Sequence, residues 1–153
     1  RAYQIRCPLD NGFQQRREIR LGIDLKGGFV KGGHFPGATG HLFLGGADPV
    51  EIARQTPERV VHVHLKDVDA ELTRRVRAGE LTFDQAVRQG LFTALGQGDV
   101  DIASVIEVLE SGGFMGWYVL EQDTAFDVEP APGAGPVVDA RVSVEFLRSL
   151  GSS

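Results

Sequence analysis

The segment at residues 60–67, with the sequence VVHVHLKD, constrains the fold more than any other part of the chain. Its valines and leucine are typical of a short buried strand, and its last residues carry an imidazole, an ammonium group and a carboxylate. A second strand pattern, at residues 116–121, ends in the carboxylate of Glu121. In an alternating strand His62 and His64 point to the same face. We therefore expect two neighbouring parallel strands that bring His64 and Glu121 together at one rim of a sheet.

Helical patterns separate and follow these strands. Their signals are an aspartate before proline, a Thr-x-x-Gln capping box and glycines at the expected ends. The predicted helices cover residues 49–55, 69–78, 82–90 and 101–112, and a last helix has Ser143, Phe146, Leu147 and Leu150 on its inner face. The apolar run at residues 42–44 predicts the end of a strand or a segment that follows one.

The alternation of strands and helices predicts an α/β fold made of parallel βαβ units. A closed (β/α)8 TIM barrel takes about 250 residues, so a chain of 153 residues corresponds to about the last three βα units of a partial barrel. Residues 38–153 follow this pattern. Residues 1–37 are rich in glycine and basic side chains, which predicts an irregular start with at most a short strand at residues 19–25. The absence of an initial methionine is typical of a processed or truncated beginning.

Composition excludes several classes of protein. Hydrophobic residues make up 42% of the chain and charged residues 24%, which is typical of a globular protein. The net charge of −5 disfavours a nucleic-acid partner. No apolar run approaches the roughly 18 residues that span a membrane. The only cysteine is Cys7, which excludes an internal disulfide and a thiolate zinc site and favours a cytoplasmic location.

Five short motifs, in this order and at these spacings, carry a resemblance to a known family. They are residues 39–41 (TGH), 45–49 (GGADP), 62–67 (HVHLKD), 96–101 (GQGDVD) and 116–121 (GWYVLE). From residue 40 to about 150 the sequence resembles the xylose isomerase-like TIM-barrel superfamily of sugar isomerases, epimerases and dehydratases. The insertion at residues 69–95 is similar to the branch of inosose (2-keto-myo-inositol) dehydratases.

The resemblance implies a metal-dependent enzyme of inositol catabolism, a carbon–oxygen lyase that eliminates water from a small polyhydroxylated keto compound. A divalent metal, Mn, Co or Mg, would be held by four side chains, of which His64 and Glu121 match two. The resemblance also implies catalytic roles for His41 and Lys66, and substrate binding by His41, Lys66 and Asp67. A mixed carboxylate and imidazole shell suits these metals, and a metal stabilises the enediolate formed when a proton is removed beside a ketone.

The sequence departs from the family at the other two ligands. The position of the family's metal-binding aspartate holds Ala38, and the only glutamate upstream is Glu18, whose surroundings do not resemble the family.

Alternative interpretations therefore stay open. The chain could be an inactive barrel remnant or interaction module that pairs with another copy as a homo-oligomer or with a missing amino-terminal part. It could also be a hydroxypyruvate or ketose isomerase or epimerase. At the residue scale, Lys66 and Asp67 could form a loop ion pair, and His62 could be an ordinary histidine of the barrel interior.

Overall fold

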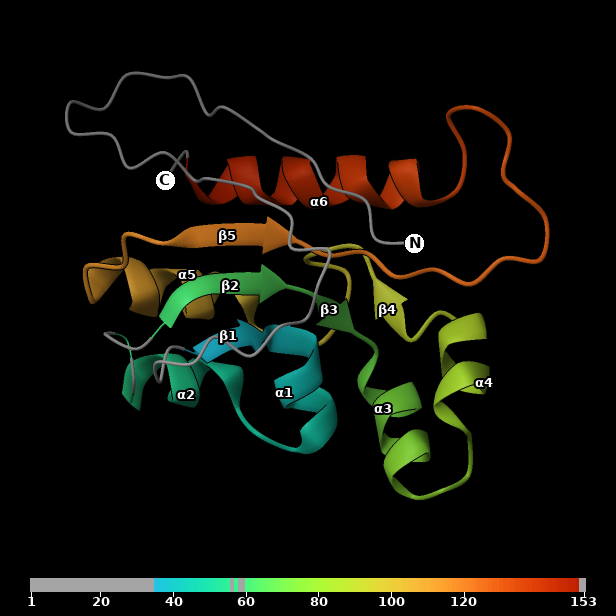
Figure 1. The fold of residues 1–153 in the computed structure, drawn as a ribbon, viewed down its shortest axis with the longest axis horizontal. Coiled ribbons are helices and arrows are strands. Elements are labelled where there is room, and N and C mark those ends of the chain that lie inside the picture. Colours follow the sequence, from blue (N-terminus) through green and yellow to red (C-terminus); the bar gives the residue numbers. More distant parts are fainter. Residues whose placement is uncertain (1–34, 56, 58–59, 152–153) are drawn as a thin grey trace.

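The computed structural model describes residues 35–55, 57 and 60–151. In this part of the chain three parallel strands form a sheet in the order β1-β2-β5, with β1 at Phe35–Ala38, β2 at Val60–Leu65 and β5 at Trp117–Leu120 (Figure 1). Two short strands, β3 at Asp67–Val68 and β4 at Phe92–Thr93, form a separate antiparallel pair. The strand expected at residues 19–25 lies outside the described residues.

The helices largely follow their sequence signals. They are α1 (Thr39–Gly45), α2 (Pro49–Gln55), α3 (Ala70–Arg77), α4 (Phe83–Arg88), α5 (Ile102–Ser111) and α6 (Pro136–Leu150). Side-chain caps explain where several begin: Asp69 accepts a hydrogen bond from the amide of Leu72, and Asp101 from that of Ser104. The predicted capping box of Thr82 and Gln85 is present at the start of α4.

The described region begins with strand β1, which is followed directly by helix α1. Residues 42–44 belong to helix α1, so of the two predicted alternatives this apolar run follows a strand and does not end one. Three apolar residues have no period that separates the two structures. The helix ends where Gly46 adopts a left-handed conformation with φ 92°. The predicted boundary at residue 37 falls inside β1, which pairs with β2.

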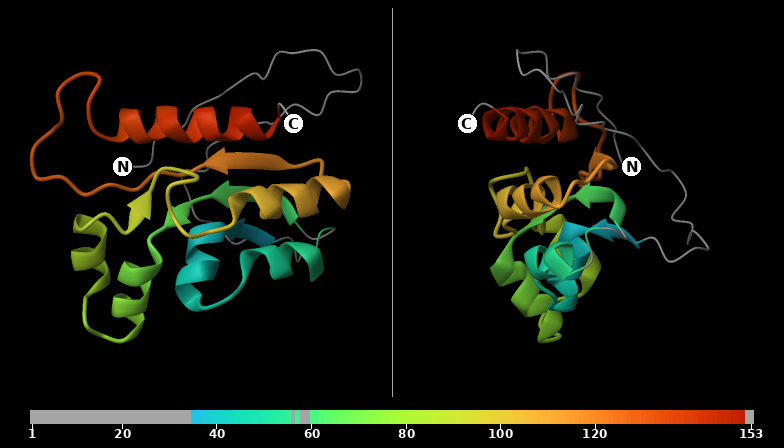
Figure 2. Two further views of the ribbon diagram at one scale, coloured as in Figure 1. Left: turned by 180° about the vertical axis from the view of Figure 1, so that it is seen from behind. Right: turned by 90° about the vertical axis from the view of Figure 1, so that its left-hand side faces the viewer.

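One face of the sheet packs against helices. Val63 and Leu65 of β2 and Leu120 of β5 are buried on this face, where α2 and α5 lie across the sheet (Figure 2). The Tyr118 hydroxyl donates to Oε1 of Glu110 on α5 at 2.9 Å. Each buried aliphatic side chain of this kind stabilises the fold by about 1.5–3 kcal/mol.

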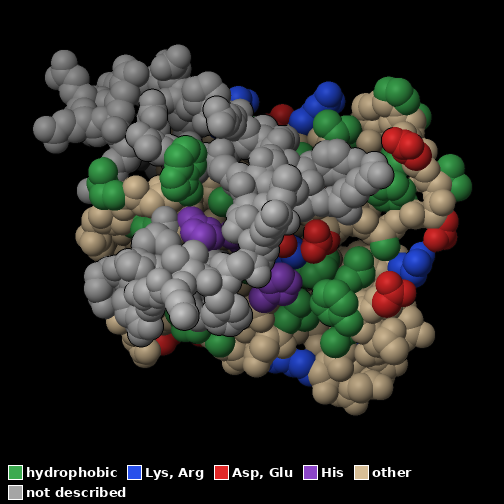
Figure 3. Space-filling model, in the orientation of Figure 1, with side chains coloured by type: hydrophobic (Ala, Val, Ile, Leu, Met, Phe, Trp, Pro, Cys, Tyr) green, Lys and Arg blue, Asp and Glu red, His purple; other side chains and the backbone are tan. Residues whose placement is uncertain are grey.

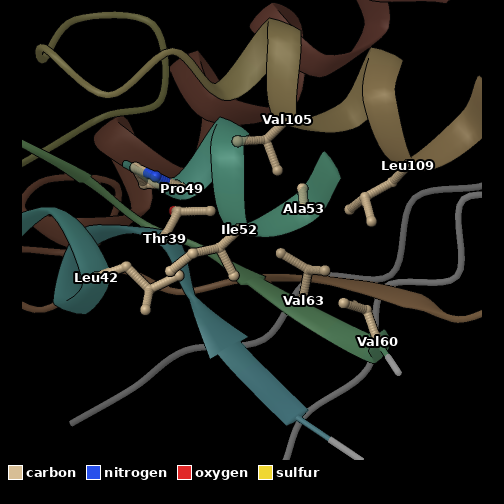
Figure 4. Close-up of a pocket in the computed structure, with 9 residues that line it drawn as sticks. All are labelled: Thr39, Leu42, Pro49, Ile52, Ala53, Val60, Val63, Val105 and Leu109. Carbon is tan, nitrogen blue, oxygen red and sulfur yellow. The ribbon is translucent and has the colours of Figure 1, made fainter. Parts of the chain in front are cut away.

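The packing between the sheet and these helices leaves a small cavity. Side chains from α1, α2, β2 and α5 point into an apolar space of about 20 Å³ (Figure 4). Its walls are almost entirely aliphatic, so it has the character of a gap in the apolar packing between these elements rather than of a polar ligand site.

The helix α6 lies along the β5 side of the sheet (Figure 1). Its inner face includes Ser143, whose Oγ accepts a hydrogen bond from the amide of Leu95, and the buried Leu147. Among the described residues, no helix is both long and apolar enough to cross a bilayer.

Candidate functional site

The site lies at the carboxyl ends of β2 and β5. The two strands are parallel and in register, so that Leu65 lies opposite Leu120, and the amide of Glu121 donates to the carbonyl of Leu65 at 3.0 Å. Lys66 and Glu121, which directly follow these two residues, therefore lie next to each other at the carboxyl ends of the strands. In parallel α/β sheets these ends are where ligands bind.

Glu121 is the centre of a hydrogen-bonded cluster. Its Oε2 lies 2.9 Å from Nδ1 of His64, and its Oε1 accepts from Nζ of Lys66 at 2.7 Å. Burial alone raises the pKa of Glu121, but the hydrogen bonds and charges of His64 and Lys66 outweigh it and lower the pKa to about 2. Glu121 is therefore an ionised acceptor at neutral pH, and Nδ1 of His64 donates to it. The expected convergence of His64 and Glu121 is observed.

Lys66 is the most deeply buried charge of the cluster. Its side chain is 1% exposed, and Nζ lies 2.7 Å from Glu121 and 2.6 Å from Oδ2 of Asp123. The same Nζ stands 4.2 Å from the centre of the Phe92 ring, a cation–π contact. A buried ammonium group is stable only with such partners. Lys66 thus pairs with residues beyond β5, and not with the neighbouring Asp67.

The motif at residues 39–41 holds Lys66 in place. The Thr39 hydroxyl donates to the carbonyl of Lys66 at 2.7 Å and accepts from its amide at 2.9 Å. A Cβ atom on Gly40 would lie 2.9 Å from Cγ of Lys66, so glycine permits the close approach of α1. These two contacts explain the threonine and the glycine of the motif in physical terms.

The third residue of that motif, His41, borders the cluster. Its ring meets Phe92 edge-on, with the ring centres 6.4 Å apart. Partial burial, and then the charge of Lys66, lower the pKa of His41 below its usual 6.5, while Glu121 and Asp123 act in the opposite direction. The imidazole is therefore neutral at pH 7 and can accept a proton.

Asp67, for which the resemblance implies substrate binding, lies away from the contacts around Glu121 and accepts hydrogen bonds from the backbone. It is fully buried, and its two oxygens accept hydrogen bonds at 2.9–3.1 Å from the backbone amides of Val68, Gly96, Gly98 and Val100. Burial raises its pKa above 3.8, and the four amides act in the opposite direction. Because its acceptor positions are directed at backbone amides of β3 and of the loop at residues 94–100, Asp67 has the geometry of a structural residue.

Two members of the site were not predicted from the sequence. Asp123 follows Glu121 by two residues, and the period of an extended chain was a usable signal for it. No sequence pattern identified Phe92 as a member of the site, because the strands β3 and β4 that position it have only two residues each. Figure 3 shows histidine and acidic side chains gathered on the face of the sheet opposite α2 and α5. On this face the rings of His62 and His64 lie 5.4 Å apart.

The described residues do not fit a resident divalent metal. His64 and Glu121 are adjacent, but each is bonded to the other, and Lys66 takes the remaining oxygen of Glu121. Ala38 is the register partner of His64 and has no ligand atom on its side chain. Within residues 35–55, 57 and 60–151 no group of three or more His, Cys, Asp or Glu side chains is arranged to hold a metal ion.

The parallel sheet, the helices on one face and the polar cluster at the carboxyl ends of the strands define an α/β-barrel type of protein. The family model described as xylose isomerase-like TIM barrel matches residues 38–150. The chain belongs to this family, and the described residues form part of such a barrel, with three parallel strands.

Several known proteins are similar in sequence. The rhizopine catabolism protein MocC of Rhizobium meliloti is 42% identical over 115 residues, covering 75% of this chain and 34% of that protein. Inosose dehydratase of Geobacillus thermodenitrificans is 41% identical over 85 residues, covering 56% of this chain and 28% of that protein. The chain thus spans about a third of the length of these relatives.

A solved structure is also similar. It is that of a xylose isomerase domain protein from Alicyclobacillus acidocaldarius, with 20% sequence identity and a TM-score of 0.47. The match covers 78% of this chain and 38% of that one.

Proposed function

We propose that this chain is the carboxyl-terminal part of an inosose dehydratase-like barrel, and that the cluster around Glu121 binds a small polyhydroxylated keto compound. The observation that carries this proposal is the pair of carboxylates, Glu121 and Asp123, held side by side by Lys66 at the carboxyl end of the sheet. Ionised carboxylates are strong acceptors for the hydroxyl groups of a sugar or cyclitol. The name inosose dehydratase, carried by one of the similar proteins, points to the same class of substrate.

The residues of the cluster have distinct roles in this proposal. Asp123 is the more accessible carboxylate, with 38% of its side chain exposed, and it accepts hydrogen bonds from substrate hydroxyls. Lys66 positions both carboxylates. His41 is neutral at pH 7 and stands at the border of the site, so it is the candidate base for the proton beside the substrate carbonyl. The protonated His41 would then return the proton to a neighbouring hydroxyl group, which leaves as water and completes the dehydration.

Binding can be tested with the 153-residue chain and a keto-inositol as the ligand, measured by isothermal titration calorimetry. We expect Asp123→Asn to weaken binding at least tenfold, because the amide replaces one acceptor oxygen by a donor. Asp84→Asn is the matched control, since Asp84 lies on α4 and pairs only with the exposed Arg88 among the described contacts. Unchanged affinity in Asp123→Asn, or no binding by the chain at millimolar ligand, would contradict the proposal.

The product distinguishes a dehydratase from an isomerase or epimerase. A dehydratase converts the keto-inositol to an ultraviolet-absorbing dehydrated diketone, whereas an isomerase or epimerase gives a product of unchanged mass. If the chain binds the ligand but yields neither product, it is a binding remnant of the barrel. In that case the dehydration part of the proposal is wrong and the binding part stands.

A further inference from the structure

We infer that the ammonium group of Lys66 is the resident cation of this site and takes the role that a divalent metal would have as counter-charge for Glu121 and Asp123. This inference goes beyond the proposed function, because it concerns the charge held in the site and not the substrate. Three features of the described residues support it: the charge balance around Lys66, the hydrogen bonds that Glu121 already accepts, and the alanine at position 38.

The first observation is the charge balance. Nζ of Lys66 lies 2.7 Å from Glu121 and 2.6 Å from Asp123, so one positive charge is shared by two carboxylates. The Lys66 side chain is 1% exposed and therefore cannot turn outward into solvent without unpacking from Phe92. A divalent cation bound to the same carboxylates would stand next to this ammonium group, and repulsion between unscreened like charges opposes its binding.

The second observation concerns the acceptor atoms of Glu121. Oε1 accepts from Lys66, and Oε2 accepts from Nδ1 of His64. A metal at Glu121 would have to replace one of these hydrogen bonds. If the metal also bound His64, the imidazole would have to give up the proton on Nδ1 or turn so that Nε2 faces the metal.

The third observation is the neighbouring strand. Ala38 of β1 is the register partner of His64, and in a parallel sheet register partners place their side chains on the same face. A carboxylate at this position would add an oxygen ligand beside His64. The alanine methyl group adds none, so the donor set of the described residues stays at one imidazole and two carboxylates that already share the ammonium group of Lys66.

The test uses Mn²⁺ alone as the probe, with the 153-residue chain and with Lys66→Met. Binding is followed by isothermal titration calorimetry, and folding by circular dichroism. We expect Lys66→Met to bind Mn²⁺ at least tenfold more tightly than the wild type, because the variant frees two carboxylates beside His64. A further increase is expected in Lys66→Met/Ala38→Asp. Arg54→Met is the matched control, since it removes an exposed cation that pairs with Glu51 on α2.

A second measurement needs no variant. The histidine ring signals of the wild-type chain are recorded by NMR while Mn²⁺ is added, because a bound paramagnetic ion broadens signals within a short distance. We expect no selective broadening of His64 at an equimolar amount of Mn²⁺. Selective loss of the His64 signal, or a folded Lys66→Met variant that gains no more affinity than Arg54→Met, would overturn the inference. Because no substrate is present, either result leaves the proposed substrate binding unaffected.

Discussion

At the scale of single residues, Glu121 decides the electrostatics of the site. Its pKa of about 2, against an ordinary value of 4.5, means that folding favours the ionised form. The stabilisation is fully present above pH 4.5 and is lost as the pH falls towards 2, because the unfolded chain takes up the proton first. The shift corresponds to a stabilisation on the order of 3 kcal/mol at neutral pH.

The variant Glu121→Gln tests this directly. At pH 7 we expect its free energy of unfolding to be lower than that of the wild type by about 2–3 kcal/mol, because the buried Lys66 loses the less exposed of its two carboxylate partners. The difference should shrink steadily as the pH is lowered from 4.5 to 2.5. Urea unfolding at a series of pH values measures both quantities, and an equal difference at pH 7 and pH 2.5 would show that the Glu121 pKa is not depressed.

Single residues differ in how well the sequence predicted them. His64, Lys66 and Glu121 could be identified because each stands at or just beyond the end of a strand pattern. The role of Asp67 could not, because three of its four amide partners belong to a loop about 30 residues further along the chain, and a fold is needed to bring them together. The same holds for the contact between Lys66 and Phe92.

At the scale of elements, the helix boundaries were the most predictable feature. An aspartate or threonine that caps a helix bonds to an amide no more than three residues away. A short stretch of sequence is therefore enough to predict where the helix begins. The strand β1 was not predicted, because Phe-Pro-Gly-Ala has poor strand propensity and owes its conformation to pairing with β2. Pairing partners that are distant in sequence leave no such local signal.

The loop at residues 94–100 is the element that depends most on one side chain. In Asp67→Asn the side chain keeps its shape but directs an NH2 group at amides that need an acceptor. We expect a loss of roughly 2–4 kcal/mol in the free energy of unfolding, since at least one buried amide stays unsatisfied. Asp101→Asn is the control, because asparagine caps a helix as well as aspartate does and should change stability by less than about 0.5 kcal/mol. Equal effects in guanidinium unfolding would refute a structural role for Asp67.

At the scale of the whole molecule, the alternation of strands and helices was enough to predict a partial α/β barrel, because parallel strands require helical crossovers. The packing of the core was not predictable in detail. The apolar cavity between the sheet, α2 and α5 arises from how side chains of four separate elements meet, which no periodic pattern specifies.

The core should therefore respond strongly to loss of volume next to this cavity. Leu109 is 1% exposed and lines it, so Leu109→Ala enlarges an existing space. We expect a loss of about 3–5 kcal/mol in the free energy of unfolding. Val128→Ala removes aliphatic carbon from a residue that is 82% exposed and should cost less than about 0.5 kcal/mol. A loss below about 1 kcal/mol in Leu109→Ala, by thermal or chemical unfolding, would contradict the packing described for α5.

The proposed site exists only if His64 and Glu121 meet at the carboxyl ends of β2 and β5. The most direct measurement is a double-mutant cycle on the free energy of unfolding at pH 7, with His64→Ala, Glu121→Ala and the double variant. Because the two side chains share a partly buried hydrogen bond of 2.9 Å, we predict an interaction energy of about 1 kcal/mol or more. Effects that add to within about 0.3 kcal/mol would show that the two residues do not form one site.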